Sequence, residues 1–525
     1  MKFLHNARIY TLESVHPIAS VLVIDSGQVV AVGGEELLAG VEHAEGENMH
    51  GRVILPGLTD AHIHLQEYAR SLQAVDCEGL SRLEILHRMA GCLAETPPGA
   101  WLQGHGWNQN DWGGGWPGAA ELDAIAPHNL VYLTAKSLHA AWVNTAALQL
   151  AGISASTLDP ANGSIQRDEH GSPTGILFEE ALKLVETVIP EPGVEVLAKT
   201  FLELIPKLWR MGITGVHDFD GRTCFMALQF LHSRGQLRLR VLKSIPFELM
   251  SQAVALGLRS GFGNDFLRIG SIKLFADGAL GPHTAAMVAP YVDEPQNRGI
   301  LLLKAEDIFD YGCRAAAGGL SLAVHAIGDR AVHEVLDGFA RLRKYEQEHA
   351  LPALRHRMEH IQTILPEDSG RLAGLDLIAS MQPVHAPSDM PMADRLLGDR
   401  AALSYAWHTQ SELGATLAFG SDAPVESANP FHGLHAAVTR RRADGSPGPA
   451  GWFPEQRLTV VEALAGFTAG PAYAAGMENR LGRLSPGFLA DLIVLEADPF
   501  TCDPADLFAL QPVATMVAGE WVWQS

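Results

Sequence analysis

The chain has 525 residues, 47% of them hydrophobic and 19% charged. This is the composition of a folded globular protein, and the length allows two to four domains or one large barrel with additions. Lysine and arginine number 38 against 60 aspartates and glutamates, a net charge of −22, so nucleic acids and anionic membranes are expected to be poor partners.

Both ends of the chain have a sequence pattern typical of short β strands separated by turns. Strand-like runs lie at 7–12, 20–24, 29–32, 490–495, 513–517 and 520–523. Because the two ends share this pattern of short strands and turn residues, we predict that residues 1–55 and 476–525 together form one small β-sandwich domain.

The interior of the chain alternates apolar, strand-like runs with helix-like stretches, which is typical of βα units around a parallel sheet. Eight such runs lie at 57–64, 212–219, 237–245, 269–276, 320–326, 357–361, 377–382 and 415–421. Eight parallel strands with intervening helices suit a (β/α)8 barrel, whose catalytic groups lie at the C-terminal ends of the strands. We therefore predict an α/β protein with a (β/α)8 TIM barrel over residues 56–475.

Nearly 150 residues separate the first two of these runs, far more than a crossover helix requires. We therefore predict a long insertion after strand one, at about 65–210, above the barrel mouth. It is rich in tryptophan and contains an apparent hairpin over 163–177. Trp107 is a candidate for an apolar lid over a substrate, although a small core within the insertion would use tryptophan in the same way.

Potential metal ligands gather at the predicted strand ends. His62 and His64 are two residues apart in one strand, so their side chains point the same way. Imidazole and carboxylate suit zinc, iron or manganese at a hydrolytic site, and an aspartate there is the natural proton acceptor. A lysine fits only if it is neutral, directed at the substrate or chemically modified. The candidates are His62 and His64 on strand one, Lys273 on strand four, His325 on strand five, His360 on strand six and Asp422 on strand eight.

At these positions the sequence resembles the amidohydrolase superfamily. The resemblance is carried by the HxH pair after the Leu-Pro-Gly-Leu of 55–58, the strand-four lysine, the strand-five and strand-six histidines and the strand-eight aspartate. The long insertion and the segments 273–278, 325–329 and 420–424 are similar to its amidohydrolase-3, YtcJ-like branch, which includes N-substituted formamide deformylases. The resemblance covers essentially the whole chain.

The resemblance implies one or two divalent ions, with zinc the expected metal. It assigns the strand-one histidines and the strand-eight aspartate to the more buried ion, and His325 and His360 to a second. Lys273, if carboxylated to a carbamate, would bridge the two ions as an anion. A site with one ion and an unmodified Lys273 is the alternative.

A further comparison with the superfamily bears on the reaction. Its deaminases usually carry a glutamate three residues after the strand-five histidine, where this chain has Gly328, so deamination is disfavoured. We therefore predict hydrolysis of a non-peptide C–N bond, in an amide or an N-formyl or N-acyl amine, through a metal-activated hydroxide with Asp422 as general base and acid. Hydrolysis of a cyclic amide or an ester is the alternative within enzymes. A non-catalytic interaction protein is the alternative outside them.

Besides Trp107, three histidines are weaker candidates for contacts with a small-molecule substrate. His139 lies in a segment that resembles one recurrent in YtcJ-like proteins, and is expected to reach the substrate from the insertion. His217 closes the second barrel strand, where a hydrogen-bonded place in the barrel wall is the competing interpretation. His283 stands where related sequences often carry an arginine, so a preference for acidic substrates does not transfer to this chain.

Two expectations concern the setting of the protein in the cell. No apolar run reaches the length of a signal peptide or a membrane span, so we expect a cytoplasmic protein without membrane contact. A homodimer is a common assembly for an enzyme of this size.

Overall fold

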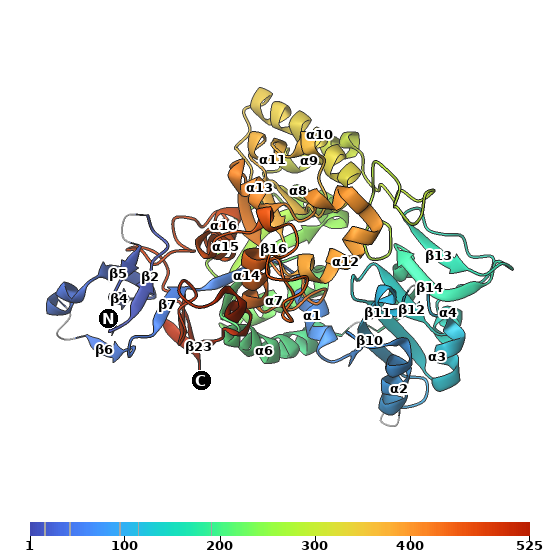
Figure 1. Cartoon of the computed structure of the whole chain (residues 1–525), viewed down its shortest axis with the longest axis horizontal. Coiled ribbons are helices and arrows are strands. Elements are labelled where there is room, and N and C mark those ends of the chain that lie inside the picture. Colours follow the sequence, from blue (N-terminus) through green and yellow to red (C-terminus); the bar gives the residue numbers. More distant parts are fainter. Residues whose placement is uncertain (15–16, 41–43, 94–95, 114, 191) are drawn as a thin grey trace.

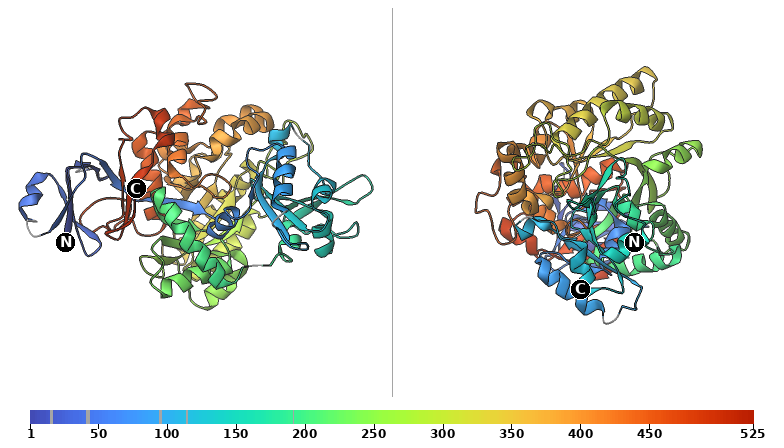
Figure 2. Two further views of the ribbon diagram at one scale, coloured as in Figure 1. Left: turned by 90° about the horizontal axis from the view of Figure 1, so that it is seen from below. Right: turned by 90° about the vertical axis from the view of Figure 1, so that its right-hand side faces the viewer.

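The computed structural model describes residues 1–14, 17–40, 44–93, 96–113, 115–190 and 192–525. A barrel occupies the centre of the molecule, with an accessory β structure on either side (Figure 1). The N-terminal strands lie at one end and the insertion at the other, both in Figure 1 and in the left view of Figure 2. Among the described residues, no helix is long and apolar enough to cross a membrane.

The barrel consists of eight strands that pair in the order in which they occur along the chain. They are β8 (Leu58–Ile63), β15 (Ile213–Asp218), β16 (Arg240–Pro246), β17 (Leu267–Phe275), β18 (Leu322–Ala326), β19 (Arg357–His360), β20 (Ile378–Met381) and β21 (Thr416–Phe419). Neighbouring strands are parallel throughout this sheet. Backbone hydrogen bonds join the first strand to the segment after the last: Asp422 N–H donates to the His62 carbonyl at 2.7 Å, and His64 N–H to the Ala423 carbonyl at 3.0 Å. The predicted (β/α)8 barrel is confirmed.

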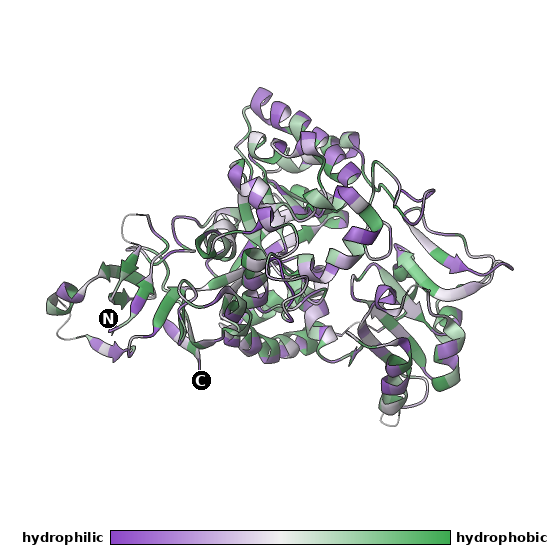
Figure 3. Ribbon diagram, in the orientation of Figure 1, coloured by the Kyte–Doolittle hydropathy of each residue, from purple (hydrophilic) through white to green (hydrophobic). Residues whose placement is uncertain are grey.

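Helices between these strands cover the outside of the barrel. The longest, α10 (Asp329–Glu348), buries Val332, Val335 and Leu336 at spacings of three and one along one face, as an amphipathic helix against a sheet should. In Figure 3 hydrophilic residues interrupt the hydrophobic ones along the outer helices. The other helices of the barrel region are α6 (Val194–Arg210), α7 (Arg222–Ser233), α8 (Met250–Ala255), α9 (Ala305–Ala317), α11 (Arg371–Gly374), α12 (His385–Leu397), α13 (Trp407–Glu412), α14 (Pro430–Thr439), α15 (Val460–Phe467) and α16 (Ala469–Ala474).

Two sheets, one built from N-terminal strands alone and the other from strands of both chain ends, form the predicted β sandwich. One sheet has the order β5 (Gln28–Gly33), β4 (Val21–Asp25), β1 (Lys2–His5), β6 (Glu45–Asn48). The other has the order β24 (Glu520–Gln524), β23 (Pro512–Val517), β22 (Leu492–Leu495), β7 (Val53–Pro56), β2 (Arg8–Tyr10), β3 (Ile18–Ala19). Leu22, Ile54, Leu492 and Met516 share one buried apolar cluster, so residues from the two ends of the chain make one core.

The sandwich runs directly into the barrel. Only Gly57 separates β7, which belongs to the sandwich, from β8, which belongs to the barrel. A Cβ at this glycine would lie 2.4 Å from Thr214 Oγ1, a distance that real Cβ contacts do not reach, so the close approach of β8 to β15 requires glycine here.

The insertion is a six-stranded sheet with its own helices. The strand order is β13 (Gly163–Arg167), β14 (Pro173–Glu179), β12 (Ala140–Val143), β11 (Leu130–Ala135), β10 (Trp101–Trp107), β9 (Val75–Asp76). The helices are α1 (Leu65–Ser71), α2 (Arg82–Cys92), α3 (Ala119–Ile125), α4 (Thr145–Leu150) and α5 (Leu182–Glu186). The predicted range of about 65–210 also takes in α6, which packs against β15 and β24 and therefore serves as a barrel helix.

A buried ion pair joins the barrel to the sandwich. Arg240 on β16 donates from Nε and Nη2 to the two carboxylate oxygens of Asp491, at 2.5 and 2.7 Å, and less than a tenth of either side chain is exposed. Removing one partner would leave the other charge buried and unpaired. We therefore expect Arg240→Met to lower the free energy of unfolding by about 3–5 kcal/mol, measured as a lower urea midpoint.

The matched control is Arg52→Met, which breaks the exposed pair of Arg52 with Glu496, whose side chains are 43% and 67% exposed. Exposed ion pairs contribute less than about 1 kcal/mol, so this midpoint should barely move. Equal midpoints for the two variants would show that the buried pair does not stabilise the junction.

Candidate functional site

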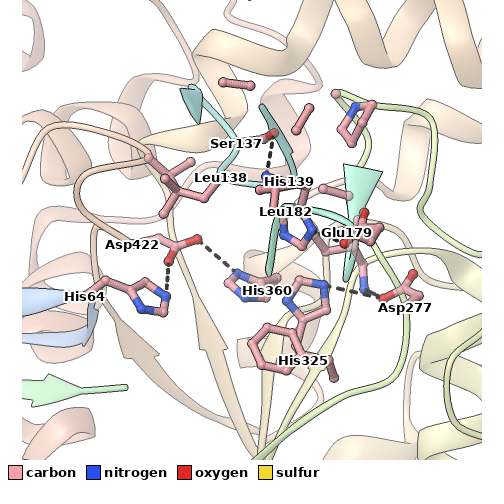
Figure 4. Close-up of a pocket in the computed structure, with 18 of the residues that line it drawn as sticks. His64, Ser137, Leu138, His139, Glu179, Leu182, Asp277, His325, His360 and Asp422 are labelled. Carbon is pink, nitrogen blue, oxygen red and sulfur yellow. Dashed lines mark hydrogen bonds and ion pairs between the residues drawn. The ribbon is translucent and has the colours of Figure 1, made fainter. Parts of the chain in front are cut away.

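A cavity of about 800 Å³ lies between the C-terminal ends of the barrel strands and the insertion. The barrel contributes Lys273 to its lining. Figure 4 shows His64 and Asp422 of the barrel, together with His139 and Glu179 of the insertion, in the same lining. A cavity of this volume, with polar groups converging on one part of it, has the size and character of a small-molecule site.

The six predicted metal-site residues lie together at the barrel end of this cavity. The Nε2 atoms of His62 and His64 lie 3.5 and 3.4 Å from Asp422 Oδ1. His360 Nδ1 lies 3.8 Å from Asp422 Oδ2, and the rings of His325 and His360 are 4.6 Å apart. In Figure 4 the Asp422 carboxylate lies between His64 and His360. One atom from each of His62, His360 and Asp422 fits within 4.8 Å of the others, which is close enough for one ion to bind all three.

In each of the four histidines, one ring nitrogen is hydrogen bonded to an acceptor oxygen of a neighbouring residue. The pairs are His62 Nδ1 with Glu359 Oε2 at 2.6 Å, His64 Nδ1 with Asp220 Oδ1 at 3.0 Å, His360 Nδ1 with Gln382 Oε1 at 2.8 Å and His325 Nε2 with the Gly278 carbonyl at 2.9 Å. Because the acceptor keeps the proton of a neutral ring on the nitrogen that faces it, the other nitrogen keeps a free lone pair. Metal-binding histidines are held in this way in known metal sites.

Two buried nitrogen atoms of this group have no hydrogen-bond partner among the described residues: His62 Nε2 and Lys273 Nζ. The Lys273 ammonium lies 4.6 Å from the centre of the Phe219 ring and 4.9 Å from that of Phe275, and burial lowers the pKa of Lys273 to about 8. Buried polar atoms in native proteins nearly always have a partner. His62 Nε2 therefore fits a bound metal ion, which would supply its partner, whereas an ammonium at Lys273 cannot pair with a cation.

The charges around these residues favour a cation. Burial alone would lower the pKa of His64, but the Asp220 and Asp422 carboxylates raise it to about 10. Burial alone would raise the pKa of Asp422, but His62 and the other imidazoles hold it well below its usual range. The polypeptide thus stabilises positive charge at this point, and a divalent ion would provide that charge in place of protons.

Positive backbone φ angles occur at four described residues of the cavity wall: 74° at His360, 62° at Leu138, 61° at Asp422 and 52° at Glu179. Residues other than glycine adopt this region rarely, and the strain is found preferentially at functional sites. Asp422 is fixed in this conformation by its N–H bond to the His62 carbonyl. Its carboxylate is therefore preorganised beside the histidines.

A buried ion pair lies beneath the histidines, inside the barrel. The Arg357 guanidinium donates to the two oxygens of Glu359 at 2.5 and 3.0 Å, and its Nη1 lies 2.9 Å from His217 Nδ1. His217 is buried in the barrel interior and does not line the cavity. The arrangement agrees with the barrel-wall interpretation of His217 and does not place it at the predicted substrate position, because its ring faces Arg357.

His283 also lies away from the cavity. Its Nδ1 is 2.7 Å from Glu294 Oε1, and its ring packs 5.4 Å from that of Tyr291. The preceding residues Gly281 and Pro282 line the cavity, but His283 does not. The loop turns its side chain toward Glu294, so the structure does not bring His283 to the substrate position predicted for it.

The insertion reaches the predicted metal-site residues through His139. This residue lies in the turn between β11 and β12, its Nδ1 is 2.7 Å from Glu179 Oε2, and its ring centre is 5.5 Å from that of His325. The Thr284 hydroxyl donates to the other oxygen of Glu179 at 2.5 Å. The dyad of His139 and Glu179 is thus held against a barrel loop and faces the same space as His325 (Figure 4).

Trp107 lines the cavity but is fully buried in the core of the insertion. Its indole N–H donates to the Leu133 carbonyl at 2.8 Å, and its ring packs against Trp112 and Trp142. The structure therefore places it as a core residue with one surface toward the cavity, rather than as a mobile lid.

Sequence reasoning missed the residues that hold the ligand candidates. Glu359 directly precedes His360, and Asp220 lies two residues after the end of β15, so both stand beside features that were identified. An acidic residue in or directly after an apolar strand could have indicated them, because a buried carboxylate needs a hydrogen-bond or ion-pair partner. Glu179 ends β14 after the apolar residues 176–178, so the same signal was present there, but in the insertion no barrel strand end pointed to it.

A second group of buried acids lies behind the site. Asp218, Asp220 and Cys224 lie close enough together to hold an ion, but the Lys243 ammonium already lies 2.8 Å from Asp218 Oδ2 and donates to the Asp220 carbonyl oxygen. This lysine supplies the positive charge there. The group therefore supports Asp220, and through it His64.

The position of the deaminase glutamate cannot accommodate a side chain in this protein. A Cβ at Gly328 would lie 2.0 Å from the Ala286 carbonyl oxygen. The Gly328 N–H donates to Asp277 Oδ2 at 2.8 Å, which fixes the backbone at that place. The structure thus gives a steric reason for the absence of a glutamate there.

Comparison with known proteins finds a matching family profile and similar sequences. Residues 45–523 match the sequence profile of the Amidohydrolase family. The chain is 32% identical to the putative amidohydrolase YtcJ of Bacillus subtilis, over 99% of both chains. It is 27% identical to the N-substituted formamide deformylase of Arthrobacter pascens, over 98% of this chain and 96% of that one.

The fold is shared with solved structures. An uncharacterized metal-dependent hydrolase from Pyrococcus horikoshii superposes with a TM-score of 0.77 and 30% sequence identity. The match covers 96% of this chain and 99% of the archaeal one. Barrel, sandwich and insertion are therefore all included in the likeness.

The close approach of the Ala286 carbonyl to Gly328 leads to a testable prediction. Gly328→Ala should lower the free energy of unfolding by about 3 kcal/mol, at the upper end of the range for overpacking, because the new methyl group meets backbone rather than a movable side chain. The control is Gly91→Ala in α2, where a Cβ would have no neighbour within 4 Å and helix propensity favours alanine. A midpoint for Gly328→Ala at or above that of the unmodified protein would contradict the steric argument.

Proposed function

The chain belongs to the Amidohydrolase family, and on that premise we propose that it hydrolyses the C–N bond of an N-formyl or N-acyl amine. The observation that carries the proposal is the set of four histidines around Asp422, each with one ring nitrogen held by an acceptor. The similarity to an N-substituted formamide deformylase supports the choice of bond.

The same observation supports an assignment of metal ligands. His62, His64 and Asp422 are proposed to hold one divalent ion, and His325 and His360 a second. Zinc suits this donor set of imidazole and carboxylate. Such ions supply Lewis-acid polarisation of a carbonyl and lower the pKa of water to roughly 7.

Lys273 is proposed to take part as its carbamate. The unmodified side chain lies buried with no hydrogen-bond partner in the described part of the chain, and an ammonium there would oppose a nearby cation. A carbamate formed with carbon dioxide carries a negative charge and two oxygen donors. It would relieve both difficulties.

Asp422 is proposed to move the proton during the reaction. Its pKa lies well below the usual range because the surrounding imidazoles favour the charged form, so it is an acceptor at neutral pH. We propose that it takes the proton of the attacking water and passes it to the leaving nitrogen. The strained backbone at Asp422 keeps the carboxylate in place for both transfers.

The insertion is proposed to hold the substrate. His139 faces the cavity with its ring fixed by Glu179, and in Figure 4 it lies above the rings of His325 and His360, whereas Asp422 lies to the left of His360. A substrate placed between them would meet Asp422 on one side and the insertion on the other. Barrel and insertion would thus divide catalysis and substrate binding between them.

The metal assignment is tested by metal content. The purified protein should contain one or two zinc ions per chain, and chelation should abolish hydrolysis of N-substituted formamides until zinc is restored. His360→Ala should lose bound metal because it removes one ligand, whereas the exposed His170→Ala should retain it. Less than about one transition metal ion per chain would favour a non-catalytic interaction protein.

The role of Asp422 is tested by an isosteric change. Asp422→Asn should lower kcat by about 10²–10⁴-fold, the usual contribution of general acid–base catalysis, while at least one metal ion stays bound. Asp168→Asn on the exposed hairpin of the insertion is the control. Near-full turnover by Asp422→Asn with metal bound would remove Asp422 from the proton transfer.

A further inference from the structure

One wall of the cavity is formed by residues outside the proposed metal site. Helix α12 begins at His385, directly after β20, and contributes His385, Asp389 and Met392 to the cavity lining. These residues are four and three apart, so they share one face of the helix. Figure 1 shows α12 between the barrel and the strands of the insertion.

His385 has a hydrogen-bond donor with no partner. Its side chain is only 4% exposed, and its Nδ1 accepts a hydrogen bond from the Gln362 side-chain amide at 3.1 Å. The proton of the neutral ring is therefore on Nε2. No hydrogen-bond partner for Nε2 is found among the described residues, although the residue faces the cavity. Since buried polar groups are normally paired, a bound molecule is the natural acceptor.

Asp389, one turn further along α12, provides an acceptor. The Tyr405 hydroxyl donates to its Oδ2 at 2.5 Å, and within the described chain no hydrogen bond reaches the other carboxylate oxygen. Glu426 also lines this part of the cavity, where it is paired with Lys136 at 2.7 Å. A donor and an acceptor thus stand one helical turn apart on the same wall.

The separation between His385 and the proposed metal site indicates which part of a substrate this wall would contact. The His385 and His360 rings are nearly parallel, with 9° between their planes and 6.5 Å between their centres. A group bound by His385 would therefore lie a few bonds away from a carbonyl placed at His360. It belongs to a substituent of the substrate rather than to the bond that is cleaved.

We propose that His385 and Asp389 recognise a neutral carboxamide on the substrate, next to the scissile amide. His385 Nε2–H donates to the carboxamide oxygen, and Asp389 accepts from its N–H. A carboxylate in the same place would be repelled by Asp389, and Lys136, the cation at this wall, is already held between Glu78 and Glu426 at 2.8 and 2.7 Å. An apolar group would leave both side chains unpaired, which binding sites of this kind discriminate against strongly. The inference rests on the proposed function.

Three probes of similar shape test the proposal: N-formylglycinamide, N-isobutylformamide and N-formylglycine. The zinc-loaded protein should hydrolyse the carboxamide with a kcat/KM at least about tenfold above the other two, because only the carboxamide pairs with both side chains. His385→Leu should remove this preference, mainly by raising KM for the carboxamide, and His385→Gln, which keeps an N–H donor, should retain part of it. The exposed His349→Leu should leave the order of the probes unchanged.

Two results would overturn the proposal: equal hydrolysis of the three probes by the unmodified protein, or an undiminished preference in His385→Leu. If no probe is hydrolysed, calorimetric titration of the same intact protein separates the two hypotheses. Tighter binding of N-formylglycinamide, lost in His385→Leu, would uphold this site while the proposed reaction fails. Binding without preference would overturn this site as well. An unchanged urea midpoint for His385→Gln would show that substitution at this position does not unfold the protein, so that a lost preference reflects the binding site.

Discussion

The buried pair of Arg357 and Glu359 is the interaction on which the site depends. Arg357 extends across the barrel interior, where it also donates to the Ala61 carbonyl and to Ser380, each at 2.7 Å. One guanidinium thus ties β19 to β8 and β20. Glu359, held by that guanidinium, accepts from His62 Nδ1 and so fixes which ring nitrogen faces the cavity. The pair would be costly to bury without this complete set of partners.

The two halves of the cavity come from parts of the chain with different physical roles. The barrel presents ligand candidates on strand ends, where backbone pairing on both sides limits movement. The insertion presents His139 from a turn and steadies it through Glu179, which is itself anchored on Thr284 of a barrel loop. The contact between the halves is polar and specific. Substitutions in such an insertion can therefore alter the cavity surface without moving the ligand candidates on the barrel.

The fold was predictable because its signals are periodic and local. Each of the eight predicted runs overlaps a barrel strand. The pattern of short strands and turns at both chain ends predicted the sandwich. The convergence of His62, Lys273 and Asp422 followed from the barrel, since all strand ends meet at one rim. Hydrogen-bond partners were not predictable in this way. Whether His217 faces Arg357 or a substrate depends on side-chain packing across the barrel, and no spacing along the chain encodes that.

The sandwich has a consequence for synthesis of the protein. Strand β7, which leads directly into β8, pairs with β2 on one edge and with β22 on the other, so the second edge has no partner until residues 492–495 have been synthesised. Unpaired strand edges promote association between chains. The nascent chain therefore carries an open strand edge close to His62 and His64 until β22 has been made, and a chain that stops before residue 492 would be prone to aggregate.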